Sequence, residues 1–258
     1  MRKELAIAAL AIGVGGIAHA QEAPRDPFEP FNRAMFSFNE KVDEYALKPV
    51  ALGYRAVTPK FFRTGVSNVL SNLRSPVVFA NDVLQAAPER AGATLARFGV
   101  NSTIGVVGIF DVAKEMGITK HGEDFGQTMG RWGIHPGPYL VIPFFGPSSV
   151  RDGIGSLVDV GLDPLTYARF DGDDAFRITR TALGVVSARE AGIEAVNNVY
   201  ETSIDPYVTV RTTYSEIREG AVHNGQTNVQ DLPEFEEIPA QPATEPPTEP
   251  SPTPPKGN

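Results

Sequence analysis

The chain has 258 residues, of which 41% are hydrophobic and 21% are charged, and its formal net charge is −8. This length and composition suit one sizeable globular core followed by a tail. The acidic balance and the lack of a basic run disfavour nucleic acid as a partner, and also simple electrostatic binding to anionic lipid. The sequence has no cysteine, so it forms no disulfide and offers no thiol for attachment of a lipid.

The first twenty residues have the features of a secretory signal peptide. Arg2 and Lys3 precede an apolar stretch at 5–17 that is too short and too rich in glycine to span a bilayer comfortably. The A-x-A pattern that ends at Ala20 is typical of a cleavage site. We therefore expect a signal peptide at 1–20, cleaved after Ala20, with an uncleaved N-terminal anchor as the alternative. Residues 21–27 are polar and predict a flexible lead.

An amphipathic helix is predicted after this lead. Apolar residues recur at spacings of three and four, which places them on one helical stripe. The stripe consists of Phe28, Phe31, Met35, Phe38, Val42 and Tyr45. Pro30 would lie in the first turn and Pro49 just past the end. Such a stripe is most simply part of a core. Because four of its six members are aromatic, contact of Phe28, Phe31, Met35 and Phe38 with a membrane surface is the alternative.

Three further helical stretches are predicted to open at Pro59, Pro76 and Pro88, with Pro76 also ending the preceding helix. One side of the first stretch is apolar, through Phe62, Val66, Val69, Leu70 and Leu73. The links between the stretches are short, which favours antiparallel neighbours. We therefore expect helical hairpins in this part of the chain.

The C-terminal third predicts two helices and a tail. Residues 173–200 predict the longest helix of the chain. Asp205 and Pro206 are then typical of an N-cap and a first helical residue, and the helical pattern runs to about Gly220. From 223 to 258 the chain becomes rich in proline and glutamate, and we expect this tail to be disordered.

Residues 124–153 combine dense glycine and proline with many aromatic and aliphatic side chains. The glycines and prolines exclude one long regular element, and the apolar content is too high for a disordered linker. We expect a packed, irregular segment with a short helix before Gly133 and an extended run at 139–142. A buried structural loop is one interpretation of it. A backbone scaffold that shapes a ligand passage is the other, because glycine permits close approach.

No catalytic motif is apparent, since the sequence contains neither a GxSxG elbow nor a Walker A loop in the mature region. His121, Glu123, Asp124 and His135 are a conceivable metal set, but their spacing matches no known motif, which favours surface or turn histidines. We therefore expect a protein that is not an enzyme and that carries no metal and no other cofactor.

Six blocks of the sequence are similar, in order, to those of a known family. They are DPFEPFNRAMFSFN (26–39), NLRSPVVFANDVLQ (72–85), RFGVNSTIGVVGIFDVA (97–113), DFGQTMGRWG (124–133), GPYLVIPFFGPSSVRDG (137–153) and DPYVTVR (205–211). Over residues 26–222 the chain resembles the MlaA/VacJ family of outer-membrane phospholipid-transport proteins. Members of that family typically begin, once mature, with a lipidated cysteine, which this chain lacks.

The resemblance implies an all-α fold at 28–222: a ring-like bundle of helical hairpins whose irregular Gly/Pro-rich central segment forms an amphipathic channel. It implies a place at the outer membrane, on its periplasmic side. It further implies removal of phospholipids from the outer leaflet, transfer to a periplasmic Mla-type lipid carrier, and maintenance of outer-membrane lipid asymmetry. An outer-membrane porin trimer is the other implied partner.

A phospholipid path needs an apolar wall for acyl chains and a polar wall for the headgroup, because charge is costly to bury without partners. Candidates for the apolar wall are Phe125, Trp132, Tyr139, Phe144 and Phe145, and candidates for the polar wall are Asn101, Gln127, Arg131, Arg151 and Asp152. Two other functions remain open at this point. One is a periplasmic scaffold that binds a membrane-protein partner, and the other is a lipid esterase with an unrecognised Ser/His pair.

Overall fold

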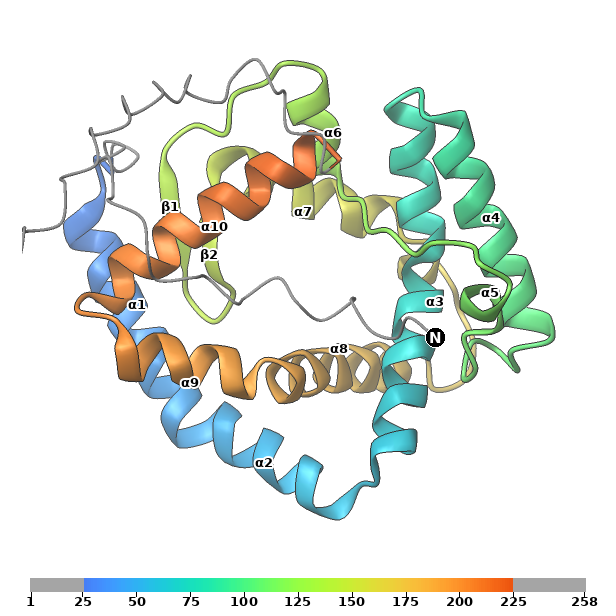
Figure 1. Ribbon diagram of the computed structural model, residues 1–258, viewed down its shortest axis with the longest axis horizontal. Helices are drawn as coiled ribbons and strands as arrows, with labels where there is room; N and C mark the ends of the chain where they lie inside the picture. Colours follow the sequence, from blue (N-terminus) through green and yellow to red (C-terminus); the bar gives the residue numbers. More distant parts are fainter. Residues whose placement is uncertain (1–25, 225–258) are drawn as a thin grey trace, which may run out of the picture. The chain divides into compact units, whose positions relative to one another are not determined.

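The computed structural model describes residues 26–224 (Figure 1). Contacts between residues divide the chain into two units, Met1–Gln226 and Thr227–Asn258. Every described residue belongs to the first unit. The predicted signal peptide, most of the predicted lead at 21–27 and nearly all of the predicted tail at 223–258 lie outside the described residues. Within the described part, the helices begin at Glu29 and end at Val222.

The predicted N-terminal helix extends further than expected. Helix α1 (Glu29–Val42) passes through the π-helical turn η1 (Asp43–Leu47) directly into α2 (Lys48–Val57). The expectation that Pro49 lies past the end of a helix is therefore wrong, because Pro49 occupies the first turn of α2. A proline has no N–H to donate to a helical hydrogen bond. The π turn directly before α2 replaces the regular α-helical hydrogen bonds of the backbone at this point. The chain can thus turn from α1 into α2 without a loop.

The prolines at 76 and 88 behave differently from each other. Helix α3 (Lys60–Leu84) contains Pro76 in its interior, so the prediction that this proline ends a helix is wrong. Val77 and Val78, directly after Pro76, are buried, and tertiary packing of this kind outweighs the roughly 3 kcal/mol cost of an interior proline. Pro88 does open a helix, α4 (Pro88–Thr103), which packs against α3 as the expected helical hairpin.

The predicted long helix at 173–200 is divided into two. Helix α8 (Asp173–Ala191) ends at Gly192 and α9 (Ile193–Thr202) follows, so α3, with 25 residues, is the longest described helix. Asp205 caps α10 (Pro206–Val222) as predicted, since its side chain accepts a hydrogen bond from the Val208 N–H. The remaining helical elements are α5 (Val112–Glu115), α6 (Phe125–Arg131), α7 (Val150–Leu162) and the 3₁₀ turn η2 (Pro164–Thr166).

The central Gly/Pro-rich segment contains the predicted short helix, α6, and the predicted extended run, β1 (Tyr139–Ile142). Strand β1 pairs antiparallel with β2 (Gly146–Ser149), with Tyr139 opposite Ser149. The fold is therefore helical with one small hairpin in addition. At its tip, Phe144 has φ +65° and Gly146 has φ +85°, and this left-handed backbone makes the tight turn.

Two asparagines of α1 hold this hairpin. Asn32, fully buried, donates to the Tyr139 carbonyl and accepts from the Val141 N–H at 2.8 Å. Asn39, two turns later, donates to the Ile142 carbonyl and accepts from the Phe144 N–H at 2.7 Å. Each side-chain amide thus replaces one peptide group of a neighbouring strand, and α1 is fixed to the edge of β1.

The contacts between elements close into a ring. Element α1 packs on β1, β1 on β2, and β2 on α7, which also packs on α6 and α3. Helix α3 then contacts α8, α8 contacts α2, and α2 leads back to α1 through η1 (Figure 1). The described elements agree with the expected ring-like helical architecture.

Polar side chains dominate the buried positions of this ring. Among the described residues, 16 polar or charged residues are buried against 11 apolar ones, whereas 32 large hydrophobic residues are exposed. An apolar cluster of Tyr139, Val141 and Tyr207 is the main hydrophobic core. Soluble proteins seldom expose large contiguous apolar areas, so this distribution indicates that much of the surface contacts something other than water. No helix at 26–224 is long and apolar enough to cross a membrane.

Candidate functional site

A partly buried ionic network joins α6, α7 and α10. Arg218 of α10 donates to both Asp124 oxygens, at 2.7 and 2.9 Å, and to both Asp152 oxygens, at 2.9 and 2.8 Å. Tyr214 donates a further hydrogen bond to Asp152 at 2.5 Å. Burial raises the pKa of Asp124, but its hydrogen bonds with Arg218 and Gln127 outweigh this and lower that pKa to about 2. The carboxylates are therefore charged and fully engaged.

The crossing of α6 and α7 depends on a glycine. A Cβ at Gly155 would lie 2.3 Å from the Gly126 nitrogen, which is far inside contact distance. The two short helices approach this closely because position 155 has no side chain. The glycines of the central segment thus serve helix packing at this point.

The structure places the candidates for the polar wall in three different surroundings. Gln127, Arg151 and Asp152 are buried in or beside the ionic network. Asn101 lies elsewhere, where it donates to Asp111 and accepts from the Ala113 N–H. Arg131 is exposed. A cavity of about 560 Å³ between the central segment and α10 is lined by Tyr139, Arg151 and Asp152, together with His135 and His223.

The candidates for the apolar wall are also divided. Phe125 and Trp132 stack edge to face, 5.6 Å apart, and the Trp132 indole donates to the Leu84 carbonyl. Tyr139 belongs to the buried core. At the hairpin tip, Phe144 and Phe145 are 72% and 86% exposed. The central segment thus presents two aromatic side chains outward at its tip instead of gathering all five around one space.

The stripe on α1 divides in the same way. Met35 packs against the Tyr139 cluster, as a core residue would. Phe28, Phe31 and Phe38 remain 47%, 52% and 40% exposed, and Phe38 stacks on Phe144 at 5.1 Å. The exposed part of the stripe and the hairpin tip therefore meet through the Phe38–Phe144 contact.

The four residues weighed as a metal set have separate partners. His121 contacts Asp82, Glu123 pairs with Arg90, and Asp124 pairs with Arg218, while His135 lies at the 560 Å³ cavity. Within 26–224, no cluster of three potential ligands is suitable for a metal ion.

One hydroxyl–histidine–carboxylate group lies near this region. Thr94 contacts the His121 Nε2 atom at 3.1 Å, and Asp82 contacts the same nitrogen at 2.9 Å. A catalytic triad uses both ring nitrogens, one for the acid and one for the nucleophile. Thr94 and Asp82 are also buried, with 5% and 0% exposure. This arrangement ties α3 to α4 and to the segment before α6, and it does not have the geometry of an esterase triad.

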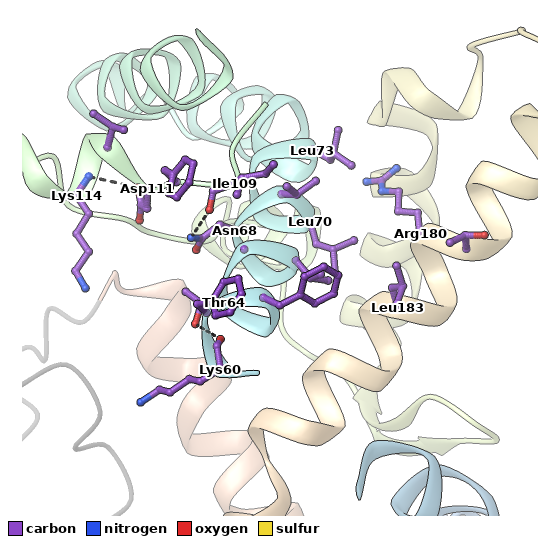
Figure 2. A pocket seen from close by; sticks show the side chains of 18 of the residues that line it. Lys60, Thr64, Asn68, Leu70, Leu73, Ile109, Asp111, Lys114, Arg180 and Leu183 are labelled. Atoms are coloured by element: carbon purple, nitrogen blue, oxygen red, sulfur yellow. Dashed lines mark hydrogen bonds between the residues drawn. The ribbon is translucent and has the colours of Figure 1, made fainter. Parts of the chain in front are cut away.

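A larger cavity lies elsewhere, between α3, residues 109–115 and α8. Its volume is about 1060 Å³. Its wall includes the whole predicted apolar side of α3, namely Phe62, Val66, Val69, Leu70 and Leu73, and also Phe61, Ile109, Phe110, Phe176 and Leu183. Figure 2 shows Leu70 and Leu73 of α3, Ile109 and Leu183 of α8 around this space.

The lining of this mainly apolar cavity also includes three cationic side chains and the carboxylates of Asp111 and Glu115. Lys60 and Lys114 lie on one side and Arg180 on the other (Figure 2). Several wall residues are strongly exposed for their type, with Phe61 at 78% and Phe110 at 61%. Such a space is unfavourable when filled with water and suits a long apolar ligand. None of the ten residues that the sequence suggests for a lipid path lines it, whereas the apolar stripe that the sequence predicts on α3 forms one of its walls.

Comparison with known proteins identifies the family. The family model described as MlaA lipoprotein matches residues 24–221. The chain belongs to the MlaA family. An uncharacterized protein of Rickettsia typhi is 33% identical over 76% of this chain and 78% of its own length. The Escherichia coli intermembrane phospholipid transport system lipoprotein MlaA is 31% identical over 89% of this chain and 91% of its own.

A solved MlaA-like structure has the same fold. That structure was described in work on the structural basis for maintenance of bacterial outer membrane lipid asymmetry. It aligns with this chain with a TM-score of 0.68 at 31% sequence identity. The alignment covers 77% of this chain and 99% of that one. The helical architecture expected from the sequence is thereby confirmed. MlaA relatives are named as lipoproteins, whereas this chain has no cysteine.

Proposed function

We propose that this protein transports phospholipid between membranes as a binding and transfer protein and not as an enzyme. Family membership and the apolar cavity between α3 and α8 support this proposal together. The observation that carries it is the cavity itself. It offers about 1060 Å³ of space with an apolar wall inside a protein whose other buried positions are largely polar.

A phospholipid can move from a bilayer into the cavity by partition between two apolar surroundings, and no covalent bond has to break. An acyl chain leaves a bilayer only if its methylenes meet another apolar surface, since each one exposed to water costs about 0.8 kcal/mol. The side chains of Phe62, Leu70 and Leu183 provide such a surface at the cavity. Charged groups at its margins keep the headgroup in polar surroundings, which avoids the cost of burying a charge.

The finer parts of the proposal follow the family resemblance. The protein would reside on the periplasmic side of the outer membrane, remove phospholipids from the outer leaflet and pass them to a periplasmic Mla-type carrier, with a porin trimer as membrane partner. Its attachment would depend on exposed aromatics, among them Phe28, Phe31 and Phe38, because it has no cysteine to acylate. The hairpin tip with Phe144 and Phe145 would extend the same apolar surface.

The test is to fill the cavity without changing the fold. In Leu183→Trp a bulky side chain from α8 enters the cavity, whereas Ile178→Trp places the same side chain on an exposed position of the same helix. Purified variants are incubated with vesicles that contain a pyrene-labelled phospholipid. Bound lipid is then measured by fluorescence and by mass spectrometry.

We expect Leu183→Trp to bind lipid about tenfold more weakly, since excluding two methylenes at ~0.8 kcal/mol each is enough for that change. Ile178→Trp should bind like the wild type, and both variants should keep the wild-type circular dichroism. Equal binding by a folded Leu183→Trp variant would contradict the role of this cavity. A wild-type protein that binds no lipid would favour the scaffold hypothesis instead.

A further inference from the structure

A second cavity lies beside the apolar one. Its volume is about 700 Å³, and it shares Leu70 of α3 and Arg180 of α8 with the apolar cavity. On α8, Phe176 and Leu183 line the apolar cavity, whereas Arg177, one residue after Phe176, lines the second one. Successive helical residues point about 100° apart, so the two cavities lie on neighbouring faces of the same two helices. Arg180 stands at the boundary between them.

Cationic side chains outnumber carboxylates in the second cavity. Three arginines line it, Arg74, Arg177 and Arg180, against the single carboxylate of Asp163. An arginine side chain has five N–H donors in a planar fork. A cavity with this lining favours an anion, and the geometry of the fork matches the oxygens of a phosphate.

Most of this donor capacity is unused within the described residues. Arg180 donates one hydrogen bond, from its Nη1 atom to Asp163 at 2.6 Å. No side-chain hydrogen bond or ion pair joins Arg74 to another residue at 26–224, although its charge acts on the nearby Asp159 and lowers the pKa of that carboxyl against the effect of burial. The Ser187 hydroxyl, also in the cavity wall, is buried and has no partner there. Arg177, by contrast, is engaged by Asp173 at 2.7 Å and by a second carboxylate. Arg180 and Arg74 are therefore the groups left to bind a ligand.

We infer that the two cavities together hold one anionic diacyl lipid, with its acyl chains in the apolar cavity and its phosphodiester at Arg180 and Arg74. This inference rests on the proposed function and specifies where that function recognises the headgroup. An amphiphile has one charged end and one apolar end, and here a cationic and an apolar cavity adjoin at Arg180. The opposite margin of the apolar cavity, with Lys60 and Lys114, is the competing place for the headgroup.

The experiment compares two lipids that share the same acyl chains. Binding of phosphatidylglycerol and of diacylglycerol to the full chain is measured from vesicles by pyrene fluorescence. A charge-assisted hydrogen bond to a phosphate stabilises by enough to change affinity about tenfold. We therefore expect the wild type to bind phosphatidylglycerol about tenfold or more tightly than diacylglycerol.

The variant Arg74→Gln/Arg180→Gln should remove this preference, so that phosphatidylglycerol binds no more tightly than diacylglycerol does. Arg169→Gln, which removes the same charge from a side chain that is 73% exposed and outside both cavities, should leave the preference intact. Because Asp163 loses its partner in the double variant, Arg74→Gln alone and Arg180→Lys are measured as well. The former should reduce the preference, and the latter should largely retain it because it keeps the charge.

Several outcomes overturn the inference. A preference removed by Lys60→Gln/Lys114→Gln instead would place the headgroup at the opposite margin. Equal binding of a fatty acid and of phosphatidylglycerol would show a carboxylate site, and binding of inorganic phosphate with no gain from acyl chains would show a free-phosphate site. Equal binding of the two diacyl lipids defeats only this inference. Binding of neither lipid defeats the proposed function as well.

Discussion

The junction of α6, α7 and α10 and the space between α3 and α8 are held in opposite ways. At the junction, one arginine and two aspartates make four hydrogen bonds, and glycine allows the backbones of α6 and α7 to touch. Between α3 and α8 the side chains are apolar and leave about 1060 Å³ unfilled. The first region is specified by directional contacts, and the second is left open to a ligand.

The difference follows from the surroundings that we propose. Apolar burial drives folding only when the alternative is water, and a surface that faces lipid tails gains little from it. Polar side chains on the inside then fix the positions of the helices, because each would be costly to leave without a partner. The predictions below remove such contacts one kind at a time, and they are ordered by the size of the expected loss.

The largest effect is expected at Arg218. The change Arg218→Leu leaves the buried Asp152 and the partly buried Asp124 without their shared cation, and removal of one partner from a buried ion pair costs about 3–5 kcal/mol. Denaturant unfolding followed by circular dichroism measures the loss. Arg169→Gln is the control, because the Arg169–Asp173 pair is exposed and such pairs contribute about 0–1 kcal/mol. Similar small losses in both variants would show that the junction does not depend on its ionic network.

The two asparagines of α1 offer a graded comparison. Asn32→Ala leaves the Val141 N–H and the Tyr139 carbonyl without partners in the buried core, and each such group costs about 1–3 kcal/mol. Asn39→Ala frees the Phe144 N–H, which lies at an exposed turn and can bind water instead. We expect a loss of about 2–4 kcal/mol in the free energy of unfolding for Asn32→Ala and about 1 kcal/mol or less for Asn39→Ala. Equal losses in unfolding experiments would argue against two different roles.

Much of the local structure was predictable because it depends on near neighbours in the chain. The cap at Asp205, the start at Pro88 and the extended run at 139–142 all follow from local backbone preferences. The error at Pro76 has the opposite cause. Burial of Val77 and Val78 keeps α3 intact across Pro76, and burial of this kind is set by distant parts of the chain.

The candidate site was harder to predict for the same reason. The apolar stripe from Phe62 to Leu73 was visible, but a stripe does not reveal whether a neighbour packs onto it or stands away from it. Asn32 and Asn39 each follow a phenylalanine and lie seven residues apart, which places them on one helical face. That spacing indicates an extended backbone segment that runs along α1 and bonds to both side-chain amides. Arg218 gave no such signal, because its partners lie 94 and 66 residues away in sequence.

The ionic junction also predicts a dependence on acid. Although burial acts in the other direction, bonds with Arg218 lower the pKa of Asp124 to about 2, below its ordinary value of 3.8. A lowered pKa stabilises the folded state fully above the ordinary value, and this stabilisation is lost as the pH falls through the folded pKa. We expect a loss on the order of 2 kcal/mol between about pH 4 and pH 2 that is absent in Asp124→Asn. Burial raises the pKa of Glu123 and Asp159, so these groups act in the opposite direction and at higher pH.

Unfolding free energies measured at several pH values for both proteins give this difference directly. The dependence of the unfolding free energy on pH is compared between the wild type and Asp124→Asn. The difference between the two curves removes the contribution of the other carboxylates, which both proteins share. Parallel curves for the wild type and Asp124→Asn between pH 4 and pH 2 would contradict a lowered pKa at Asp124.

The smallest change in stability is expected on the exposed stripe of α1. Phe28→Ser/Phe31→Ser alters side chains that are about half exposed, so the free energy of unfolding should change by about 0.5 kcal/mol or less per site. Membrane binding should change much more. Burial of a phenylalanine contributes roughly 1.5–3 kcal/mol, and transfer of two half-exposed rings into a bilayer contributes about half of that each, which corresponds to a loss of about tenfold or more in vesicle binding.

Met35→Ser is the matched control on the same stripe, because Met35 packs against the Tyr139 cluster. It should lower the unfolding free energy by about 2 kcal/mol or more and leave vesicle binding of the folded protein unchanged. Flotation with vesicles and denaturant unfolding are measured on both variants. If the double variant binds vesicles as well as the wild type does, then attachment depends on another surface, such as the tip with Phe144 and Phe145. If it unfolds instead, the exposed stripe belongs to the core, and the contrast between a polar interior and a lipid-facing exterior fails at α1.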